Sequence, residues 1–352
     1  MLVTAVQWAL ISYLLNERSD VAVPSSSVSS LSVGAIPGEG RQEERRASFS
    51  VVSNRGNTNY EGVAAAIFFS APTWFHRRYP VLIQNALVNT PRTWAIQLFV
   101  NPIFWKERVL PYHPGLGRLL EQNSDRIVIT ELPKELQKLK KPNQNIPLQA
   151  WFWKSLLADR VLMWSANGIF CTHGNTEDHW QSMLEMDYIG VPWTKLHRVG
   201  GDGSTHSYRN RTLMLQALDY AHNGKNHIKI EPPDSTFFVS TLLKMKDDPT
   251  INTNHIIRLA TREDTLWFGG VNTTDSDVKG HARPIPPPPM VVSGTQAHLS
   301  FQHREDLLLV CPELKVIFPT LHEPACFGAH PNPDVCRSTI CALRDPLPSS
   351  GC

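Results

Sequence analysis

Three glycines and an aspartate lie close together in residues 199–211 (VGGDGSTHSYRNR), at Gly200, Gly201, Asp202 and Gly203. Glycine adopts backbone conformations that other residues avoid, so the cluster is consistent with a tight turn. It is equally consistent with a floor on which a planar or sugar-like ligand approaches the backbone. The chain contains no P-loop, HExxH or GxSxG motif and no strand-to-helix GxGxxG, which removes the commonest sequence evidence for a nucleotide-binding loop, a zinc protease or an α/β-hydrolase.

Cysteine is the other residue type whose placement is informative. Cys171 stands alone in mid-chain, and the other five follow residue 310: Cys311, Cys326, Cys336, Cys341 and Cys352. A zinc site favours two close pairs, whereas Cys336 and Cys341 are the only close pair in this sequence. Disulfides that close a C-terminal segment rich in Pro, Gly and His are therefore the preferred interpretation, with their pairing left open.

Composition excludes several classes of protein. The chain has 352 residues, 34 Lys and Arg against 32 Asp and Glu, a formal net charge of +2, and 41% hydrophobic and 19% charged residues. A groove that follows nucleic-acid phosphates normally shows as a basic excess, so we expect no nucleic-acid partner. The mixture is that of neither a disordered chain nor a bundle of membrane helices, which leaves a folded chain of one large or two medium domains.

The N-terminus has the composition of a targeting segment. Residues 1–15 are uncharged and mostly apolar, and charged residues follow from Glu17. As a helix they would extend about 22 Å, short of the roughly 30 Å hydrocarbon core of a membrane. We expect residues 1–18 to be a signal peptide or a short signal anchor and residues 19–58 to be a flexible stem. Because no Lys or Arg precedes the apolar run, a buried first helix or a gene start placed too far downstream is the alternative.

The expected location follows from these two features. Disulfides imply an oxidising compartment, and a targeting segment would deliver the chain there. We expect a type II protein of the ER or Golgi membrane in the secretory pathway, with a secreted protein as the alternative.

From residue 62 onward, apolar runs alternate with stretches of helical spacing. The runs typical of buried strands are residues 63–70, 94–100, 126–130 and 160–163. The stretches with helical spacing are residues 75–89, 148–158 and 212–221. This alternation predicts an α/β fold with a mostly parallel sheet flanked by helices, and ligands of such sheets bind at the carboxyl ends of the strands.

A proline-rich connector precedes the cysteine-rich end. Residues 280–289 include four consecutive prolines and predict a stiff extended segment. Beyond it, the apolar runs LLLV and LKVIF predict that the cysteine-rich segment, residues 295–345, packs against the main domain. A separate extracellular protein-binding module is the alternative, and residues 346–352 form a tail.

Several segments, taken in order, resemble a known family. They are residues 78–100, RIVITELP (126–133), WFWKSLLADRVLMWSANGIFC (151–171), MDYIGVPW (186–193) and GGDGSTHSYRNR (200–211). This order is similar to that of a little-characterised domain-of-unknown-function family related to the GT-A glycosyltransferases. The resemblance spans residues 60 to about 345, and MDYIGVPW followed by the glycine and RNR cluster is its most specific part. It implies a GT-A-like domain over residues 59–345.

The resemblance also implies a catalytic and a metal-binding set. The family's FQTDS segment, with its metal-contacting acid, aligns with Asn167, where a neutral amide replaces the carboxylate, so a manganese ion would bind weakly or be absent. The family's acidic ED pair aligns with Pro233 and Asp234, which leaves Asp234 as the candidate base for an acceptor hydroxyl or, alternatively, an N-cap. A late G-x-H aligns with Gly328 to His330, where His330 is either a metal ligand or structural.

Trp164 and Trp193 are expected to border the donor cleft. Donor or substrate contacts are implied for Asn167 and for a further group: Asp187, Tyr188, Trp193, Gly201, Asp202, Gly203 and Arg209. Ordinary alternatives exist for each kind of residue. The aspartates could cap a turn or a helix, the aromatics could be core, and the arginine could be solvated. Of the two glycosylation sequons, Asn272 is the expected glycan site, because a glycan on Asn210 would obstruct packing of the RNR segment.

The combined interpretation is a glycosyltransferase of hexosyltransferase type. It would transfer a sugar from a nucleotide-sugar donor to the hydroxyl of a glycan or another acceptor, with a divalent cation, Mn²⁺, as the expected cofactor. The alternative is a sugar- or nucleotide-binding pseudoenzyme of the same fold, which the replacement of acids at Asn167 and Pro233 favours. If Asp234 is an exposed base, its replacement by Asn should abolish transfer and change stability by less than about 1 kcal/mol.

Overall fold

The computed structural model describes residues 59–69, 76–192, 199–223, 228–249, 256–269, 288–293 and 308–317. The predicted targeting segment, the stem, the tail and most of the cysteine-rich segment lie outside these residues. None of the helices within the described ranges is long and apolar enough to cross a membrane.

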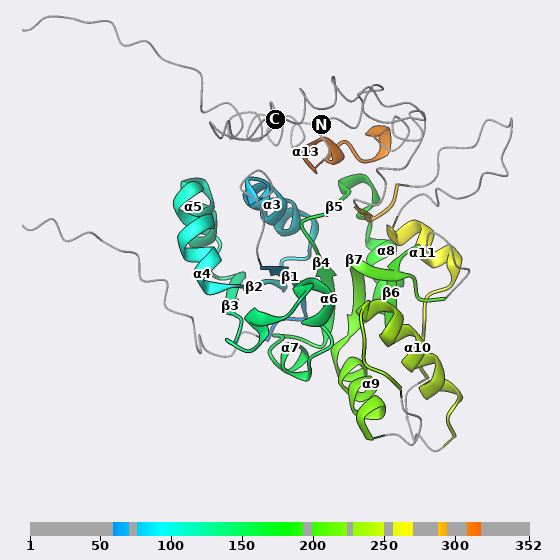
Figure 1. Ribbon diagram of the computed structural model, residues 1–352. Helices are drawn as coiled ribbons and strands as arrows, with labels where there is room; N and C mark the ends of the chain where they lie inside the picture. The colour runs from blue at the N-terminus through cyan, green and yellow to red at the C-terminus, as the bar shows by residue number, and fades with distance from the viewer. Residues whose placement is uncertain are drawn as a thin grey trace, which may run out of the picture. The chain divides into compact units, whose positions relative to one another are not determined.

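The described residues contain a six-stranded sheet in the order β3-β2-β1-β4-β7-β6 (Figure 1). Its strands are β1 (Gly62–Phe68), β2 (Trp94–Val100), β3 (Ile127–Glu131), β4 (Arg160–Trp164), β6 (Tyr188–Val191) and β7 (Asp202–Asn210). β1, β2, β3 and β4 pair in parallel, and β7 pairs antiparallel with both β4 and β6. The predicted class, an α/β fold with a mostly parallel sheet flanked by helices, is confirmed.

Continuous apolar runs form the central strands because both faces of the sheet are covered. Every residue of β1 and β2 is buried. Side chains alternate along β1, so that Ala64, Ala66 and Phe68 join one hydrophobic cluster while Val63 and Ile67 join the other. The sheet therefore lies between two cores, as a strand with no polar alternation requires.

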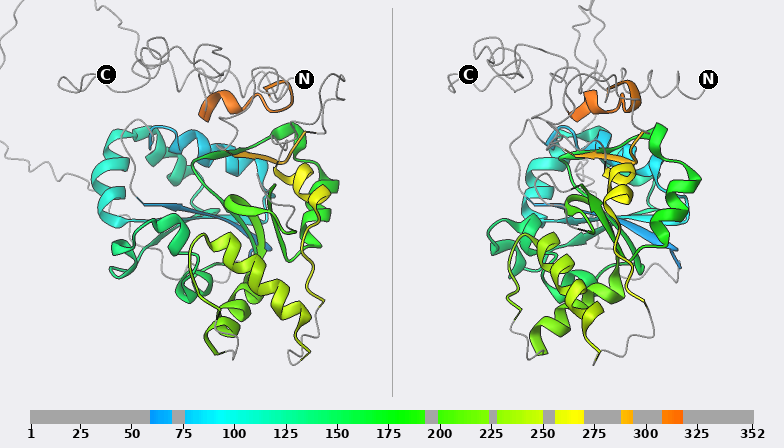
Figure 2. Two further views of the ribbon diagram at one scale, coloured as in Figure 1. Left: turned by 45° about the vertical axis from the view of Figure 1, so that its right-hand side comes forward. Right: turned by 90° about the vertical axis from the view of Figure 1, so that its right-hand side faces the viewer.

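Helices cover both faces (Figure 2). The first core contains residues of α3 (Tyr79–Asn89), α5 (Pro114–Gln122), α8 (Glu177–Leu184) and α11 (Arg262–Gly269). The second contains residues of α7 (Ala150–Lys154), α9 (Arg211–Asn223) and α10 (Asp234–Asp247). The remaining short helical elements are α4 (Pro102–Phe104), η1 (Trp105–Val109), η2 (Leu110–Tyr112), η3 (Leu136–Lys138), α6 (Pro142–Asn145), η4 (Thr172–Gly174) and α13 (Leu314–Ile317).

One predicted helix is shorter than its apolar spacing indicates. Residues 148–158 were expected to be helical, but α7 ends at Lys154. The Gln97 amide on β2 donates to the Ser155 carbonyl at 2.8 Å and accepts from the Leu157 N–H at 3.2 Å. These bonds occupy backbone groups that a longer helix would use, so the chain turns here toward β4.

A second, two-stranded sheet leads to the C-terminal segment. β5 (Gly168–Phe170) pairs antiparallel with β8 (Val291–Ser293), and Cys171, directly after β5, forms a disulfide with Cys311. Both cysteines and Leu314 are fully buried in the first core. Residues 308–317 therefore pack against the main domain. The expectation of a disulfide that closes the C-terminal segment, made with the pairing left open, is confirmed for Cys311, which pairs with the mid-chain cysteine. Cys326, Cys336, Cys341 and Cys352 lie outside the described residues.

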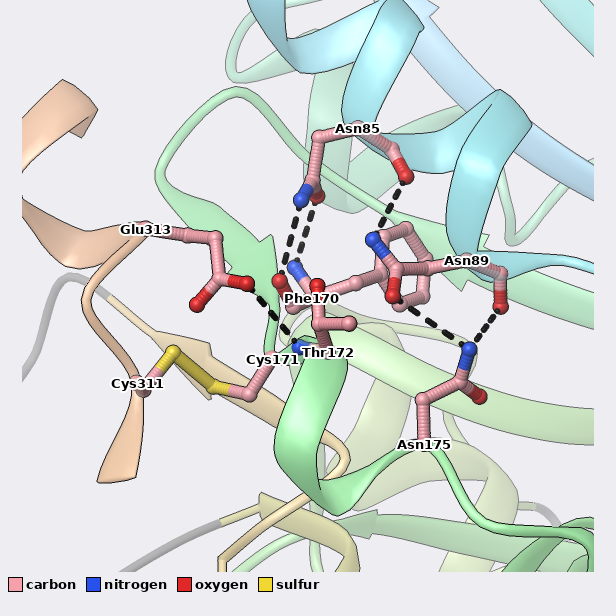
Figure 3. Close-up of a disulfide and its surroundings, with 8 residues drawn as sticks. All are labelled: Asn85, Asn89, Phe170, Cys171, Thr172, Asn175, Cys311 and Glu313. Atoms are coloured by element: carbon pink, nitrogen blue, oxygen red, sulfur yellow. Dashed lines mark hydrogen bonds between the residues drawn. A yellow bond between two sulfur atoms is a disulfide. The ribbon is translucent and has the colours of Figure 1, made fainter. Parts of the chain in front are cut away.

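Polar contacts surround this disulfide (Figure 3). The Asn85 side chain on α3 donates to the Phe170 carbonyl at 3.0 Å and accepts from the Phe170 N–H at 2.9 Å. On the other side, the Thr172 N–H donates to the Glu313 carboxylate at 3.2 Å. The backbone N–H and carbonyl of Phe170 in β5 are thus hydrogen-bonded to a side chain of α3. The disulfide attaches the C-terminal segment at the next residue, Cys171.

His206 on β7 is buried without a hydrogen-bond partner among the described residues. Its ring meets Phe170 edge-on, with centroids 5.2 Å apart, and lies directly over Gly168. Burial lowers the pKa of this imidazole from 6.5 to about 3. The folded protein therefore holds His206 neutral at pH values where the unfolded chain would protonate it.

Replacing both cysteines, as Cys171→Ala/Cys311→Ala, should lower the free energy of unfolding by about 2 to 5 kcal/mol, because the bond closes a loop of sequence separation 140. Urea denaturation at pH 7 measures the change. The oxidised and reduced wild-type protein should differ by a similar amount. Equal midpoints for wild type and variant would show that the bond does not constrain the unfolded chain.

His206→Phe should reduce the loss of stability on acidification. Between pH 6.5 and about 3 the unfolded chain binds a proton that folded His206 does not, so lowering the pH lowers the free energy of unfolding by up to about 1.4 kcal/mol per pH unit. The variant should lose this contribution, measured as the difference in unfolding free energy between pH 7 and pH 4. The exposed His222, replaced by Gln, is the control and should leave that difference unchanged.

Candidate functional site

A small pocket lies at the carboxyl ends of β1 and β4, where the topology predicts a ligand site. It is lined by Ile67, Asn143, Pro147, Met163, Trp164, Ser165, Gly203, Arg209 and Asp234. Its volume is about 20 Å³, which is room for about one water molecule. Ligand pockets that enclose a small organic molecule are many times larger, so a sugar nucleotide would lie mostly outside this cavity.

The polar centre of the pocket is a buried ion pair. Arg209 Nη1 and Asp234 Oδ2 are 2.7 Å apart, and the two side chains are 0% and 3% exposed. Arg209 also donates to Ser207 Oγ at 2.8 Å and to the Gly203 carbonyl at 3.2 Å. Each nitrogen of the guanidinium therefore has an acceptor, as a buried cation requires. The alternative that Arg209 is solvated is wrong.

Aromatic rings enclose the Arg209 guanidinium. Its central carbon lies 5.8, 5.2 and 5.6 Å from the ring centroids of Trp153, Tyr188 and Phe238. Rings at these distances stabilise a cation through their quadrupoles. Trp153 also donates from Nε1 to the Pro147 carbonyl at 2.6 Å, which ties the enclosure to the pocket wall. Tyr188 is thus a core aromatic in contact with Arg209, and burial raises the pKa of its hydroxyl.

Asp234 is the first residue of α10 and not its N-cap. The N-cap is Pro233, and no side chain caps the helix. The Asp234 carboxylate accepts a hydrogen bond from Arg209 Nη1 at 2.7 Å. Burial raises the pKa of this carboxyl, and the ion pair with Arg209 opposes the rise. The predicted base therefore faces the pocket, but as the partner of a buried arginine.

Glycine is required at these positions for two different structural reasons. Gly200 and Gly201 have φ angles of +83° and +77°, and a side chain on Gly201 would clash with the Gly190 carbonyl. These two fit the tight-turn interpretation. Gly203 lines the pocket, and a Cβ there would overlap the Arg209 guanidinium. Its missing side chain is what lets Arg209 reach the Gly203 carbonyl.

Asp202 and Asp187 support the backbone around the pocket without lining it. Asp202 accepts a hydrogen bond from Ser235 Oγ at 2.9 Å, which joins the start of β7 to α10. Asp187 is buried and accepts from the Arg258 N–H at 2.8 Å and from Asn210 Nδ2 at 3.1 Å. The side-chain oxygen Asn210 Oδ1 in turn accepts from the Leu213 N–H at 3.2 Å, near the start of α9. Asp187 is a buried structural partner in this arrangement, and the solvated cap expected as its alternative is also wrong.

The predicted metal set is not assembled within the described residues. Asn167 is exposed in the turn between β4 and β5, where its N–H donates to Ser165 Oγ at 3.3 Å, and it does not line the pocket. Nowhere in the described ranges do three or more His, Cys, Asp or Glu side chains gather as metal ligands. His330 and Trp193 lie outside these ranges. The oxygen donors at the pocket, with their one carboxylate paired to Arg209, do not fit the ligand set of a divalent cation.

Sequence reasoning missed part of the pocket wall. Asn143, Pro147 and Ser165 line it together with Trp164, and of these only Trp164 was expected at a cleft. Asn143 lies in the short helix α6 and Pro147 follows it, and a helix of this length has no periodic pattern in the sequence. The lysine-rich run that precedes them is the one sequence feature that marks this segment.

Asp234→Asn should destabilise the protein by about 3 to 5 kcal/mol, because it leaves Arg209 buried without a counter-charge. This corrects the expectation of a change below about 1 kcal/mol. Urea denaturation measures it. The matched control is Asp159→Asn, whose ion pair with Arg211 is 61% exposed on the aspartate side and should be worth about 1 kcal/mol or less.

A double variant tells whether the stability lost in Asp234→Asn comes from the unpaired charge of Arg209 or from altered packing. Arg209→Met/Asp234→Leu removes both charges and should recover most of the stability lost in Asp234→Asn. A double variant as unstable as the single one would show that the charges are not the cause.

No protein-family model matches the chain, and no curated protein matches it. Among solved structures, the apo form of the glycosyltransferase GlyE of Streptococcus pneumoniae TIGR4 is similar at 12% identity and a TM-score of 0.36, over 66% of this chain and 54% of that one. The chain thus matches about half the length of GlyE.

Two further solved structures show similarity at the same level. The galactosyltransferase LgtC, in complex with donor and acceptor sugar analogues, is 9% identical with a TM-score of 0.32, over 66% of this chain and 86% of that one. The mannosyltransferase PcManGT of Pyrobaculum calidifontis, in complex with GDP-Man and Mn²⁺, is 13% identical with a TM-score of 0.32, over 81% of each chain. The fold class stated above rests on the strands and helices of the chain itself, because TM-scores of this size decide neither fold nor activity.

Proposed function

We propose that the chain is a glycosyltransferase that binds a nucleotide-sugar donor at the carboxyl ends of β1 and β4 and transfers the sugar to a hydroxyl acceptor. The observation that carries the proposal is where the family-like segments lie. MDYIGVPW contains β6, and GGDGSTHSYRNR contains β7, and these strands are neighbours in the sheet. β7 supplies Gly203 and Arg209 to the pocket wall, and α10 supplies Asp234. β6 supplies Tyr188, whose ring lies 5.2 Å from the Arg209 guanidinium carbon.

Asp234 is the residue that would accept the proton of the acceptor hydroxyl. Transfer to a sugar carbon requires the hydroxyl to lose its proton, and a carboxylate within hydrogen-bond reach can take it. Burial alone would favour the protonated acid, which cannot act as a base. The Arg209 guanidinium at 2.7 Å opposes this effect and favours the ionised carboxylate.

The secretory pathway is the proposed location. The buried Cys171–Cys311 bond supports it, because structural disulfides form and persist in oxidising compartments. A glycan or another secreted hydroxyl compound would be the acceptor there.

A binding protein without turnover is the second candidate. The bond from Asp234 Oδ2 to Arg209 favours it, because an acid held by a buried arginine is a weaker base. The residue before it is Pro233, so a second carboxylate is missing where the family has one. Such a protein would recognise the same nucleotide or sugar and release it unchanged.

A donor panel tests the two candidates. The full chain is incubated with UDP- and GDP-sugars and hydroxyl acceptors, with Mn²⁺ or with EDTA, and both nucleoside diphosphate release and binding are measured. We expect release in the wild type and a loss of at least about 100-fold in Arg209→Met/Asp234→Leu, which removes the base while keeping the core neutral.

Each outcome selects one answer. Saturable binding without release would support the second candidate, and release that persists in the double variant would remove Asp234 as the base. If no donor of the panel is bound and no nucleoside diphosphate is released, both candidates are overturned.

A further inference from the structure

A lysine-rich segment, residues 132–145, leads into the pocket wall. Leu132 and Leu136 are buried and Leu139 packs against the second core, so the segment is attached through its leucines. The lysines face the other way and are all exposed: Lys134, Lys138, Lys140 and Lys141. The segment therefore presents positive charge to solvent from an anchored backbone.

These charges are not neutralised locally. None of the four lysines forms an ion pair with another residue that the structure describes. In contrast, Lys106 pairs with Glu131 at 2.8 Å and Arg211 with Asp159 at 2.7 Å. Glu131, directly before this segment, is thus already paired with a cation from another element.

Lys141 has a backbone conformation that is uncommon for a residue with a side chain. Its φ angle is +46°, in the left-handed region that glycine favours. Asn145 holds the turn by donating from Nδ2 to the Lys140 carbonyl at 2.6 Å. A glycine here would avoid the steric cost that the lysine side chain carries in this conformation.

Lys140 and Lys141 lie near the pocket because only a few residues separate them from Asn143 in its wall. Lys141 is the N-cap of α6, and Asn143, two residues on, lines the pocket. Two residues span at most about 7 Å of chain.

We infer that Lys140 and Lys141 supply the positive charge that binds the diphosphate of the donor, in place of a divalent cation. This inference rests on the proposed function and deepens it. A diphosphate leaving group must be stabilised by positive charge, which metal ions or basic side chains can provide. The described carboxylates do not assemble a metal site, whereas Lys140 and Lys141, which form no ion pair with a described residue, precede the pocket-lining Asn143 by three and two residues.

Binding of UDP, GDP and inorganic pyrophosphate to the full chain in EDTA tests the inference by calorimetry. We expect saturable binding without metal, weakened about tenfold in Lys140→Gln/Lys141→Gln and weakened by added salt. The matched control is Lys244→Gln/Lys246→Gln, which removes the same charge from exposed positions in the last turns of α10. It should change the dissociation constant by less than about twofold.

Lys141→Gly separates binding from folding. The substitution suits the left-handed conformation, so the denaturation midpoint should stay the same or rise while diphosphate binding weakens. Equal losses of stability and binding would show that Lys141 acts through the fold, which would overturn its role as a ligand.

The test distinguishes failure of this inference from failure of the proposed function. Nucleotide binding that requires Mn²⁺ and is unchanged in both lysine double variants would overturn the inference and leave the transferase proposal intact. Lysine-dependent binding of pyrophosphate with no preference for any nucleotide or sugar would support the lysine site and count against a nucleotide-sugar donor. Absence of binding by all three probes, with and without Mn²⁺, would overturn both.

Discussion

The buried ion pair between Arg209 and Asp234 connects most of the elements around the pocket. A guanidinium without a counter-charge is costly inside a protein, so the segments that surround it must arrive with acceptors and rings in place. β7 carries the arginine, α10 carries the aspartate, and α7 and β6 contribute Trp153 and Tyr188. The positions of these four elements are therefore coupled through one side chain.

The shape of β7 follows from the same constraint. Gly190 of β6 pairs with Ser207, but the next residue, Val191, pairs with Asp202, so four residues of β7 leave the ladder. This irregularity brings Gly203 back over the strand, where its carbonyl accepts from Arg209. Glycines at positions 200, 201 and 203 allow the detour, since each lies where a Cβ would collide with a neighbour. Bulges of this kind are common next to functional sites because they re-aim backbone and side chains.

Much of the fold could be predicted from the sequence because its signals are local. The apolar run at residues 63–70 becomes β1, and the helical spacing at residues 75–89 becomes α3, which begins later, at Tyr79. The length of α7 could not be predicted, because the bonds at its end come from Gln97 on another strand. Local pattern therefore predicts the type of an element better than its limits.

The site was predictable only in part, for the same physical reason. Asp234, Gly203 and Arg209 were named from motifs and do line one pocket. The burial of Arg209 was not foreseen, because its partners come from residues 153 to 238 and meet only in the folded chain. Asn143 and Pro147 carry no motif at all. The pairing of Cys171 with Cys311 was likewise one of many that the spacing allowed.

That disulfide has a consequence for synthesis. Cys171 is the only cysteine before residue 311, and its partner is the next cysteine in the chain. Within residues 1–352, the thiol of Cys171 therefore meets no other cysteine during vectorial synthesis until the strands of the six-stranded sheet and α9 to α11 have been made. When Cys311 emerges, the correct partner is also the first one available, and the four later cysteines compete only after it. The order of the cysteines along the chain thus favours the native pairing by timing alone.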